Sequence, residues 1–168
     1  MVVGTIVILG ITSMYVSMAR YGVEMDHQAD LQQQGTLLQE NLARRIQPAV
    51  SLFPGACGAT ANSLGIVYSD ATKNVCIYQE QNGTEILECR LPDTFPVSTA
   101  CTSTPATLLP GARAIITANS LRFDCKDPPV CTTAYETGGT WVDVQFGLSA
   151  AIGVRPVVFG TRVTLRNS

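Results

Sequence analysis

The residues best able to do covalent chemistry in this chain are its six cysteines, all of which lie beyond residue 47. No two of them form a C-x-x-C pair and the chain has one histidine, so tetrahedral zinc would need a four-cysteine site of unusual spacing. Disulfide bonds are the simpler chemistry, and they persist in oxidising compartments outside the cytoplasm. We therefore predict three disulfides among the six residues Cys57, Cys76, Cys89, Cys101, Cys125 and Cys131.

The titratable residues give little support for catalysis or metal binding. His27 lies beside Asp26 in a segment with helical spacing, where a solvated side chain explains it better than a general base. The sequence has no Ser-His-Asp motif, phosphate-binding loop or dinucleotide fingerprint. A calcium loop would need alternating oxygen ligands, which are absent around Asp124, Asp127 and Glu136. We predict no enzymatic activity, no cofactor, no metal and no small-molecule substrate.

The charge of the chain argues against a nucleic-acid partner. Only 14% of its 168 residues are charged and the formal net charge is −2. Binding to phosphates requires clustered cations, which this composition does not supply. The length indicates one domain in addition to a long N-terminal segment.

The segment that must position the rest of the chain is Met1 to Ala19, which is uncharged and precedes Arg20. It is rich in Val, Ile, Leu and Met, and it approaches the ~20 apolar residues of a transmembrane helix. No helix breaker stronger than Gly occurs before Pro48, so we predict one helix of about 70 Å. Its first half should pack in a membrane or a helical bundle through Val3, Ile6, Val7, Ile8, Leu9, Ile11, Met14, Tyr15 and Met18.

Two other interpretations of the apolar segment are weaker. A secretory signal peptide is one, since Ser17-Met18-Ala19 resembles a cleavage site, but a positive n-region is missing and the apolar run is too long. A buried core helix is the other, but so small a head cannot surround a helix that is apolar on every face. We therefore favour a membrane or filament-core helix over 1–19.

Residues 20–47 follow a one-sided pattern, with apolar residues at spacings of seven, four and four between glutamines and charged residues. This half should pack its apolar stripe on a sheet, with Leu37 widening the stripe. Gln47-Pro48 should end the helix, because a residue before Pro avoids helical geometry. The stripe consists of Leu31, Leu38, Leu42 and Ile46.

In the head, residues 48–168, the sequence predicts short strands between turns. Two-residue turns at Asn82-Gly83 and Gly138-Gly139 predict two β-hairpins. An antiparallel sheet that packs on the helix stripe is an α+β arrangement. The predicted strands are 64–69, 75–81, 84–91, 121–124, 132–137, 140–146 and 162–166.

The Asn82-Gly83 turn sets a register in which Cys76 lies opposite Cys89. We therefore prefer Cys76–Cys89 with Cys57–Cys101, over the alternative Cys57–Cys76 with Cys89–Cys101. Cys125 and Cys131 flank Pro128-Pro129 and should close a short loop. The long segment 92–111 is rich in Pro and Thr, and a loop of this length is typically functional or pinned, here through Cys101.

The order of these segments resembles type IV pilins and type II secretion pseudopilins. Residues 39–46, QENLARRI, resemble the helix of PilW-type minor pilins. Residues 161–167, TRVTLRN, are similar to the C-terminal strand of that group and of the J-type minor pseudopilin. The resemblance covers residues 1–47 and roughly the last fifty residues. It implies a pilin-like α+β fold, with a long N-terminal helix packed on a disulfide-bonded antiparallel sheet.

The resemblance also implies a structural function. The chain would be a subunit, and a minor one, of a type IV pilus or related filament that supports assembly, adhesion, motility or DNA uptake. Its partners would be other pilin subunits. It would be held in the inner membrane with its head in the periplasm before it joins an extracellular filament. A type II secretion pseudopilin is one alternative, and a monomeric membrane-anchored binding module or adhesin, with 92–111 as its contact loop, is another.

One departure from the family pattern concerns the N-terminus. The family's processing signal is a Gly followed by Phe-Thr-Leu-x-Glu-Leu ahead of the apolar run. This sequence starts at Met1-Val2-Val3, about where that signal would end, without the family's Phe or Glu. We expect that the chain is trimmed at this point.

A truncation tests the division of the helix into two halves. A chain that begins at Glu24 should be soluble and keep its β-sheet, because the cut removes the uncharged segment and spares the stripe. The full chain should require detergent. Sedimentation and circular dichroism measure both properties. Aggregation of the shorter chain, or a freely soluble monomeric full chain, would contradict the prediction.

Overall fold

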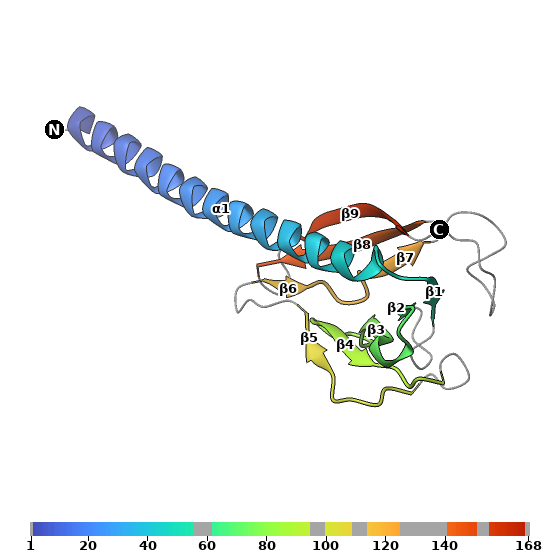
Figure 1. Ribbon diagram of the computed structural model, residues 1–168. Helices are drawn as coiled ribbons and strands as arrows, with labels where there is room; N and C mark the ends of the chain where they lie inside the picture. Colours follow the sequence, from blue (N-terminus) through green and yellow to red (C-terminus); the bar gives the residue numbers. More distant parts are fainter. Residues whose placement is uncertain are drawn as a thin grey trace.

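A computed structural model describes residues 2–55, 62–94, 100–108, 114–124, 141–150 and 155–166, without the side chains of 2–7 and 54. Helix α1, Val2–Ile46, runs unbroken from the N-terminus and projects far beyond a head built of antiparallel strands (Figure 1). The N–H of Gln47 donates to the carbonyl of Ala43 at 2.9 Å and ends the helix before Pro48, as predicted. The α+β class and the long N-terminal helix are therefore confirmed.

The first sheet has five strands in the order of the sequence. Between its second and third strands, the short 3₁₀ helix Ala71–Lys73 is capped by the Asp70 side chain. Neighbouring strands are all antiparallel, so the sheet is a simple meander. Its strands are β1 (Ser51–Pro54), β2 (Ser63–Val67), β3 (Val75–Gln79), β4 (Ile86–Arg90) and β5 (Ala106–Thr107).

The second sheet is organised around one long central strand, β8 (Trp141–Ser149). Strand β9 (Val157–Thr164) pairs along nearly the whole of β8. The short strands β6 (Ile115–Ile116) and β7 (Arg122–Asp124) pair with the two ends of β8 along its other edge. The second half of α1 lies across β8 and β9, so this sheet supports the helix (Figure 1).

The predicted register of the first hairpin is confirmed. Cys76 lies opposite Cys89 and Tyr78 opposite Leu87, on either side of the turn at Asn82. Asn82 has a φ of 62°, the left-handed geometry that a two-residue turn requires. The predicted strands 64–69, 84–91 and 140–146 correspond to β2, β4 and β8 with shifted ends. The hairpin at Gly138-Gly139, with strand 132–137, lies outside the described residues.

Several elements were not predicted. Strand β9 begins at Val157, five residues before the predicted 162–166, and β1, β5 and β6 were absent from the prediction. Strands β5 and β6 have two residues each, too few for a period-two pattern to be recognised. They form because longer neighbouring strands provide an edge with which they can pair. This pairing depends on the tertiary structure, which the local sequence does not show.

The disulfide pairing differs from the preferred prediction. Cys89 is bonded to Cys101, and their Cα atoms lie 5.7 Å apart. The preferred pairs Cys76–Cys89 and Cys57–Cys101 are therefore wrong, whereas the Cys89–Cys101 half of the alternative is confirmed. Cys76 is also disulfide-bonded. Outside the described residues lie Cys57, Cys125 and Cys131.

Hydrogen bonds to Arg90 explain why Cys101 reaches Cys89. The Thr102 N–H donates to the Arg90 carbonyl at 2.8 Å, and the Ser103 hydroxyl accepts from the Arg90 N–H at 2.9 Å. These bonds fix the returning chain beside the end of β4. The hairpin register places Cys76 opposite Cys89, but it does not indicate where the chain returns at residues 101–103.

The predicted stripe of α1 is buried, with exposed fractions of 4%, 1%, 0% and 0% for Leu31, Leu38, Leu42 and Ile46. Leu37 is 52% exposed, so the prediction that it widens the stripe is wrong. The middle of the stripe is instead Gly35, which is buried. The stripe joins buried residues of both sheets in one hydrophobic core.

Gly35 allows α1 to lie directly on an aromatic ring. A Cβ atom at this position would come within 2.2 to 2.6 Å of three ring atoms of Phe159 on β9. The Phe159 ring is itself stacked on Phe146 of β8, with ring centroids 5.5 Å apart. The ring therefore has little room to move, and only glycine permits this distance between helix and sheet.

A buried amide, that of Gln79 on β3, helps to join the two sheets. Its Nε2 donates to the carbonyls of Gly83 and Thr117, both at 2.8 Å, and its Oε1 accepts from the Leu121 N–H at 3.0 Å. Both amide protons and the oxygen are thus satisfied, as a buried polar group requires. Gln79 holds the first hairpin against the connection between β6 and β7.

Replacing Gly35 by Ala should lower the free energy of unfolding of the head by about 1–3 kcal/mol, because the added methyl group overpacks the contact with Phe159. Urea unfolding of the full chain in detergent, followed by Trp141 fluorescence, measures this. Gly22→Ala is the matched control, since nothing lies within 4 Å of a Cβ atom there. Equal stability of the two variants would contradict the proposed packing.

Peptide mapping without reduction should recover Cys89 linked to Cys101 and no free thiol. Trypsin leaves Cys76 and Cys89 in one peptide, so a second digestion after glutamate is needed to separate them at Glu80 and Glu85. A reduced sample serves as the control. A Cys76–Cys89 link would contradict the observed pairing, and free thiols in protein from its native compartment would contradict an oxidising location.

Candidate interaction surface

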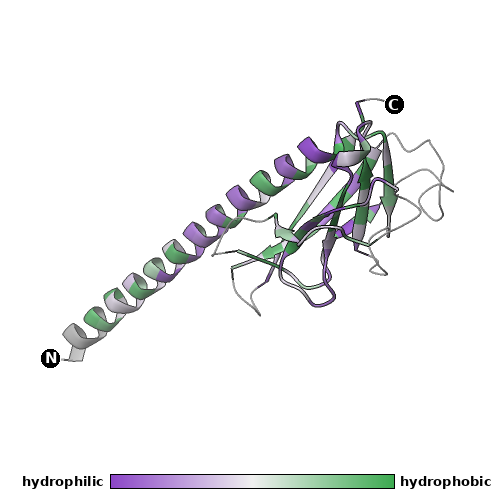
Figure 2. Cartoon of the chain, turned by 60° about the horizontal axis from the view of Figure 1, so that its bottom comes forward, coloured by the Kyte–Doolittle hydropathy of each residue, from purple (hydrophilic) through white to green (hydrophobic). Residues whose placement is uncertain are grey.

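The part of α1 beyond the head exposes large apolar side chains. Figure 2 shows hydrophobic residues recurring along this part of the helix. Each is between 44% and 75% exposed. Soluble monomers rarely expose contiguous apolar patches beyond a few hundred Å². We call this surface the projecting segment; its members are Ile8, Leu9, Ile11, Met14, Tyr15, Val16, Met18, Tyr21, Val23 and Met25.

Between residues 8 and 18, the projecting segment has one face of small residues, and Tyr21 returns to this face about one turn after Ser17. At about 100° per residue, Gly10, Ser13 and Ser17 fall together, whereas the large side chains of residues 8–18 cover roughly 220° of the helix. Nothing lies within 4 Å of a Cβ atom built at Gly10. The Thr12 hydroxyl donates to the Ile8 carbonyl at 2.7 Å, so this polar group needs no partner outside the helix. Small residues let a second helix approach closely.

The predicted packing residues map onto this segment as follows. The side chains of Val3, Ile6 and Val7 are not among those described, and the other six are all exposed. The exposed apolar surface continues past Arg20 to Tyr21, Val23 and Met25, which the sequence analysis missed. These residues lie between Arg20, Glu24 and Asp26 and are therefore not part of an uncharged run. Within the part of the chain that the structure describes, no helix is long and apolar enough to cross a membrane.

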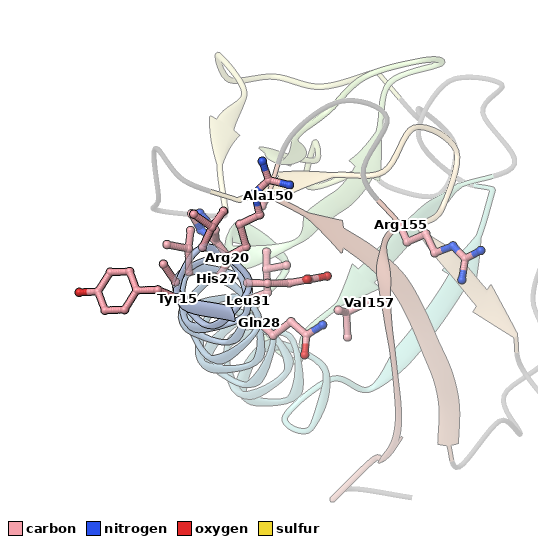
Figure 3. A pocket seen from close by; sticks show the side chains of 12 residues that line it. Tyr15, Arg20, His27, Gln28, Leu31, Ala150, Arg155 and Val157 are labelled. Atoms are coloured by element: carbon pink, nitrogen blue, oxygen red, sulfur yellow. The ribbon is translucent and has the colours of Figure 1, made fainter. Parts of the chain in front are cut away.

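A groove of about 1140 Å³ lies where α1 leaves the head. The helix forms one wall, from Tyr15 to Leu31, and Ala150, Arg155 and Val157 form the other. Figure 3 looks along the helix and shows Gln28 directed toward Val157 of β9. His27 also lines the groove and is exposed, and among the described residues no cluster of three metal-ligating side chains forms around it or elsewhere.

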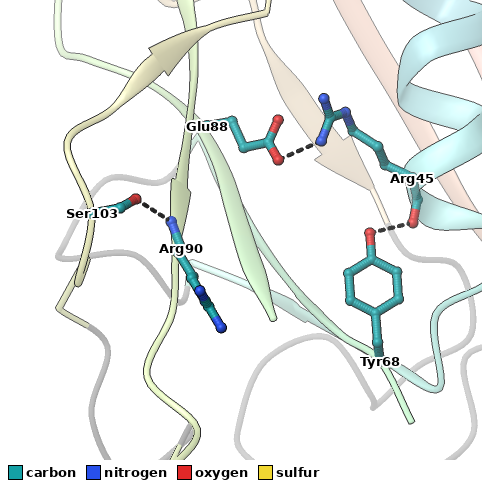
Figure 4. A network of polar contacts seen from close by, with 5 residues as sticks. All are labelled: Arg45, Tyr68, Glu88, Arg90 and Ser103. Carbon is teal, nitrogen blue, oxygen red and sulfur yellow. Dashed lines mark hydrogen bonds and ion pairs between the residues drawn. The ribbon is translucent and has the colours of Figure 1, made fainter. Parts of the chain in front are cut away.

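The C-terminal end of α1 is fixed to the head by polar contacts (Figure 4). Arg45 forms an ion pair with Glu88 of β4, and the Tyr68 hydroxyl donates to the Arg45 carbonyl at 2.8 Å. Burial raises the pKa of Tyr68, an effect that the nearby Arg45 charge partly offsets. The Arg166 N–H donates to the Gln47 carbonyl at 2.9 Å. The C-terminal end of α1 is thus bonded to β4 and to Tyr68, which follows β2, in the first sheet. The adjoining Gln47 is bonded to Arg166, which follows β9 of the second sheet.

A further polar contact holds the middle of the helix. The Gln39 side-chain amide donates to the carbonyl of Gly160 on β9 at 3.1 Å. Together with the buried stripe, this bond fixes the second half of α1 on the head, and the helix continues unbroken from there into the projecting segment. The surface is therefore presented at a fixed position relative to the sheets.

The outer face of the second sheet carries a polar cluster. Arg162 donates two hydrogen bonds to the carboxylate of Asp143, at 2.8 and 2.9 Å, and lies 3.8 Å above the ring of Trp141. The hydrogen bonds to Asp143 raise the pKa of Arg162. The charges pair with each other, so this cluster stabilises the exposed face of the sheet.

Comparisons with known proteins add no assignment: no family model, curated protein or solved structure matches this chain. The functional argument therefore depends on the projecting segment, the groove and the head that positions them.

Proposed function

We propose that this protein is a structural subunit of a type IV pilus or a related filament, and that it is a minor subunit. The observation that carries the proposal is the projecting segment. Helix α1 continues far beyond the head (Figure 1), and its large apolar side chains there are exposed. Such a surface is suited to a bundle of similar helices. The pilin-like segments 39–46 and 161–167 support the same class.

The two halves of α1 suit two successive environments. The uncharged residues 1–19 would lie in the inner membrane before assembly and in the filament core afterwards. The second half stays bound to the head throughout, because its stripe is buried and Arg45 is paired with Glu88. The head, with its Cys89–Cys101 disulfide, would face the periplasm and later the exterior, where such bonds persist.

Leaving the bilayer requires a compensating gain in the filament. Lipid tails are as apolar as Leu, so helices gain little from hydrophobicity when they exchange lipid for each other, and close packing must supply the difference. The small face of Gly10, Ser13 and Ser17 permits this closeness. The filament also covers Tyr21, Val23 and Met25, which lie beyond the uncharged run.

A monomeric membrane-anchored binding module is the second candidate. The observation in its favour is the segment 100–107, whose residues are all exposed and which is pinned by Cys101 and by the bonds to Arg90. A pinned, exposed loop is a common form of contact surface.

The same filament arguments apply to a type II secretion pseudopilin, which differs in the filament it would join.

Lysine substitutions on the projecting segment test the filament proposal. Ile8→Lys and Ile11→Lys should reduce incorporation into filaments at least about a hundredfold, because an unpaired buried charge costs several kcal/mol. Membrane localisation should suffer less, since inserting one Lys at a helix centre costs about 2.5–3.5 kcal/mol. Filament counting by electron microscopy and a pull-down of partner subunits measure assembly.

Gln33→Lys is the matched control, because Gln33 is exposed on the polar side of α1. Gln39 is unsuitable, since its amide binds Gly160. Normal assembly with Lys at both Ile8 and Ile11 would overturn the filament proposal. A binding module predicts instead that ligand binding survives Ile8→Lys and fails when the segment 92–111 is shortened.

A further inference from the structure

The turn between β3 and β4 contains an acceptor sequence for N-linked sugar. Asn82-Gly83-Thr84 fits the pattern Asn-x-Ser/Thr, in which x is not proline, and no other segment of the chain fits it. The turn itself explains the first two residues, because two-residue hairpin turns favour Asn-Gly. It does not explain Thr84, which follows the two central residues of the turn.

The fold makes no use of the Thr84 hydroxyl group. The Thr84 carbonyl accepts from the Ile116 N–H at 2.9 Å, a contact that any residue could supply. The residue is exposed, and among the hydrogen bonds of the described residues its hydroxyl has no partner. In contrast, the hydroxyl of the exposed Thr107 donates to Glu85 at 3.0 Å. A hydroxyl group two residues after Asn82 is the remaining element that the acceptor sequence requires.

The Asn82 side chain is held by its oxygen, and its nitrogen is left free. The Asn119 Nδ2 donates to the Asn82 Oδ1 at 3.2 Å, and the Asn119 Oδ1 accepts from the Asn82 N–H at 3.4 Å. Asn82 is exposed, and no hydrogen bond of the described residues involves its Nδ2. A sugar attached to Nδ2 would therefore leave both contacts with Asn119 intact.

We propose that Asn82 is the acceptor of an N-linked glycan. The donor is a lipid-linked sugar diphosphate, and the catalyst is a membrane-bound glycosyltransferase outside the cytoplasm. The Asn82 Nδ2 forms a bond to the anomeric carbon of the sugar. The bond from that carbon to the diphosphate oxygen breaks, the diphosphate leaves with the bonding electrons, and one proton of Nδ2 passes to a base of the transferase.

The proposal rests on the extracytoplasmic location of the head in the proposed function, and it does not depend on filament assembly. The Cys89–Cys101 disulfide is typical of an oxidising compartment. An Asn-x-Ser/Thr sequence is a glycan acceptor at the surface of proteins that reach such compartments. Location and acceptor sequence are therefore consistent with each other.

The turn also lies at the end of the head from which α1 projects. Gln79, just before the turn, donates to the Thr117 carbonyl at 2.8 Å. The adjacent residue Ile116 pairs with Leu148, near the C-terminal end of β8. Ala150 follows that end and lines the groove where α1 leaves the head. A lipid-linked donor is held at the bilayer, so an acceptor at this end of an anchored head would lie toward it.

Mass spectrometry of the full chain isolated from its own cells tests the proposal. After reduction, trypsin releases peptide 74–90, which contains Asn82. We expect this peptide to carry the added mass of one or more sugar residues. Electron-transfer fragmentation should place the addition on Asn82.

Three substitutions separate the acceptor sequence from the turn. Thr84→Ala should lower the amount of modified peptide at least about tenfold, whereas Thr84→Ser should retain it, because serine also supplies the hydroxyl. Asn82→Asp should abolish the modification while it preserves the hairpin, since Asp-Gly is equally suited to the turn. Trp141 fluorescence in urea establishes that each variant is folded.

The outcomes distinguish this proposal from the proposed function. An unmodified peptide 74–90 in protein with an intact Cys89–Cys101 bond would overturn glycosylation and leave the location of the head unaffected. A mass change that matches only deamidation of Asn82, or a modification that persists in Thr84→Ala, would overturn it as well. An unmodified peptide together with free thiols at Cys89 and Cys101 would contradict both glycosylation and the extracytoplasmic location.

Discussion

The contact between α1 and β9 at Gly35 is the constraint on which the rest of the structure depends. A helix can lie this close to the stacked rings of Phe159 and Phe146 only where it has no side chain. Leu31, Leu38 and Leu42 then enter the core on either side of the glycine along one helical stripe. The contact fixes which face of the helix meets the sheet, and with it the position of every residue toward the N-terminus. The ion pair of Arg45 and the amide bond of Gln39 reinforce an orientation that packing has already set.

The division of α1 follows from how much surface the head can offer. The second sheet covers the helix from about Leu31 onward, and the head ends where the groove begins. Beyond that point the same face of the helix meets, among the described residues of the head, Ala150, Arg155 and Val157 at the edge of the groove. The large apolar side chains that continue past this support are exposed, and the hydrophobic effect penalises their contact with water. The projecting segment is therefore a consequence of helix length exceeding head size.

The sequence predicted the elements that depend on local periodicity, and it did not predict the features that depend on contacts between distant segments. Helical spacing predicted Leu38, Leu42 and Ile46 at the core, and Asn82-Gly83 predicted the hairpin register. Gly35 was missed because glycine carries no hydropathy signal, and its role depends on Phe159, more than a hundred residues away. The Cys89–Cys101 bond depends on the chain returning to Arg90. For the interaction surface, the uncharged run predicted Ile8 to Met18, but Val23 and Met25 required knowledge of where the head stops.

Groove and projecting segment share residues, because Tyr15 and Val16 line the groove and also belong to the exposed apolar surface. Helix α1 is continuous through both, and its C-terminal end is fixed to the head by the ion pair of Arg45 with Glu88. The apolar surface therefore has a set position relative to the two sheets. In the filament proposed above, the position of each packed helix would determine the position of its head.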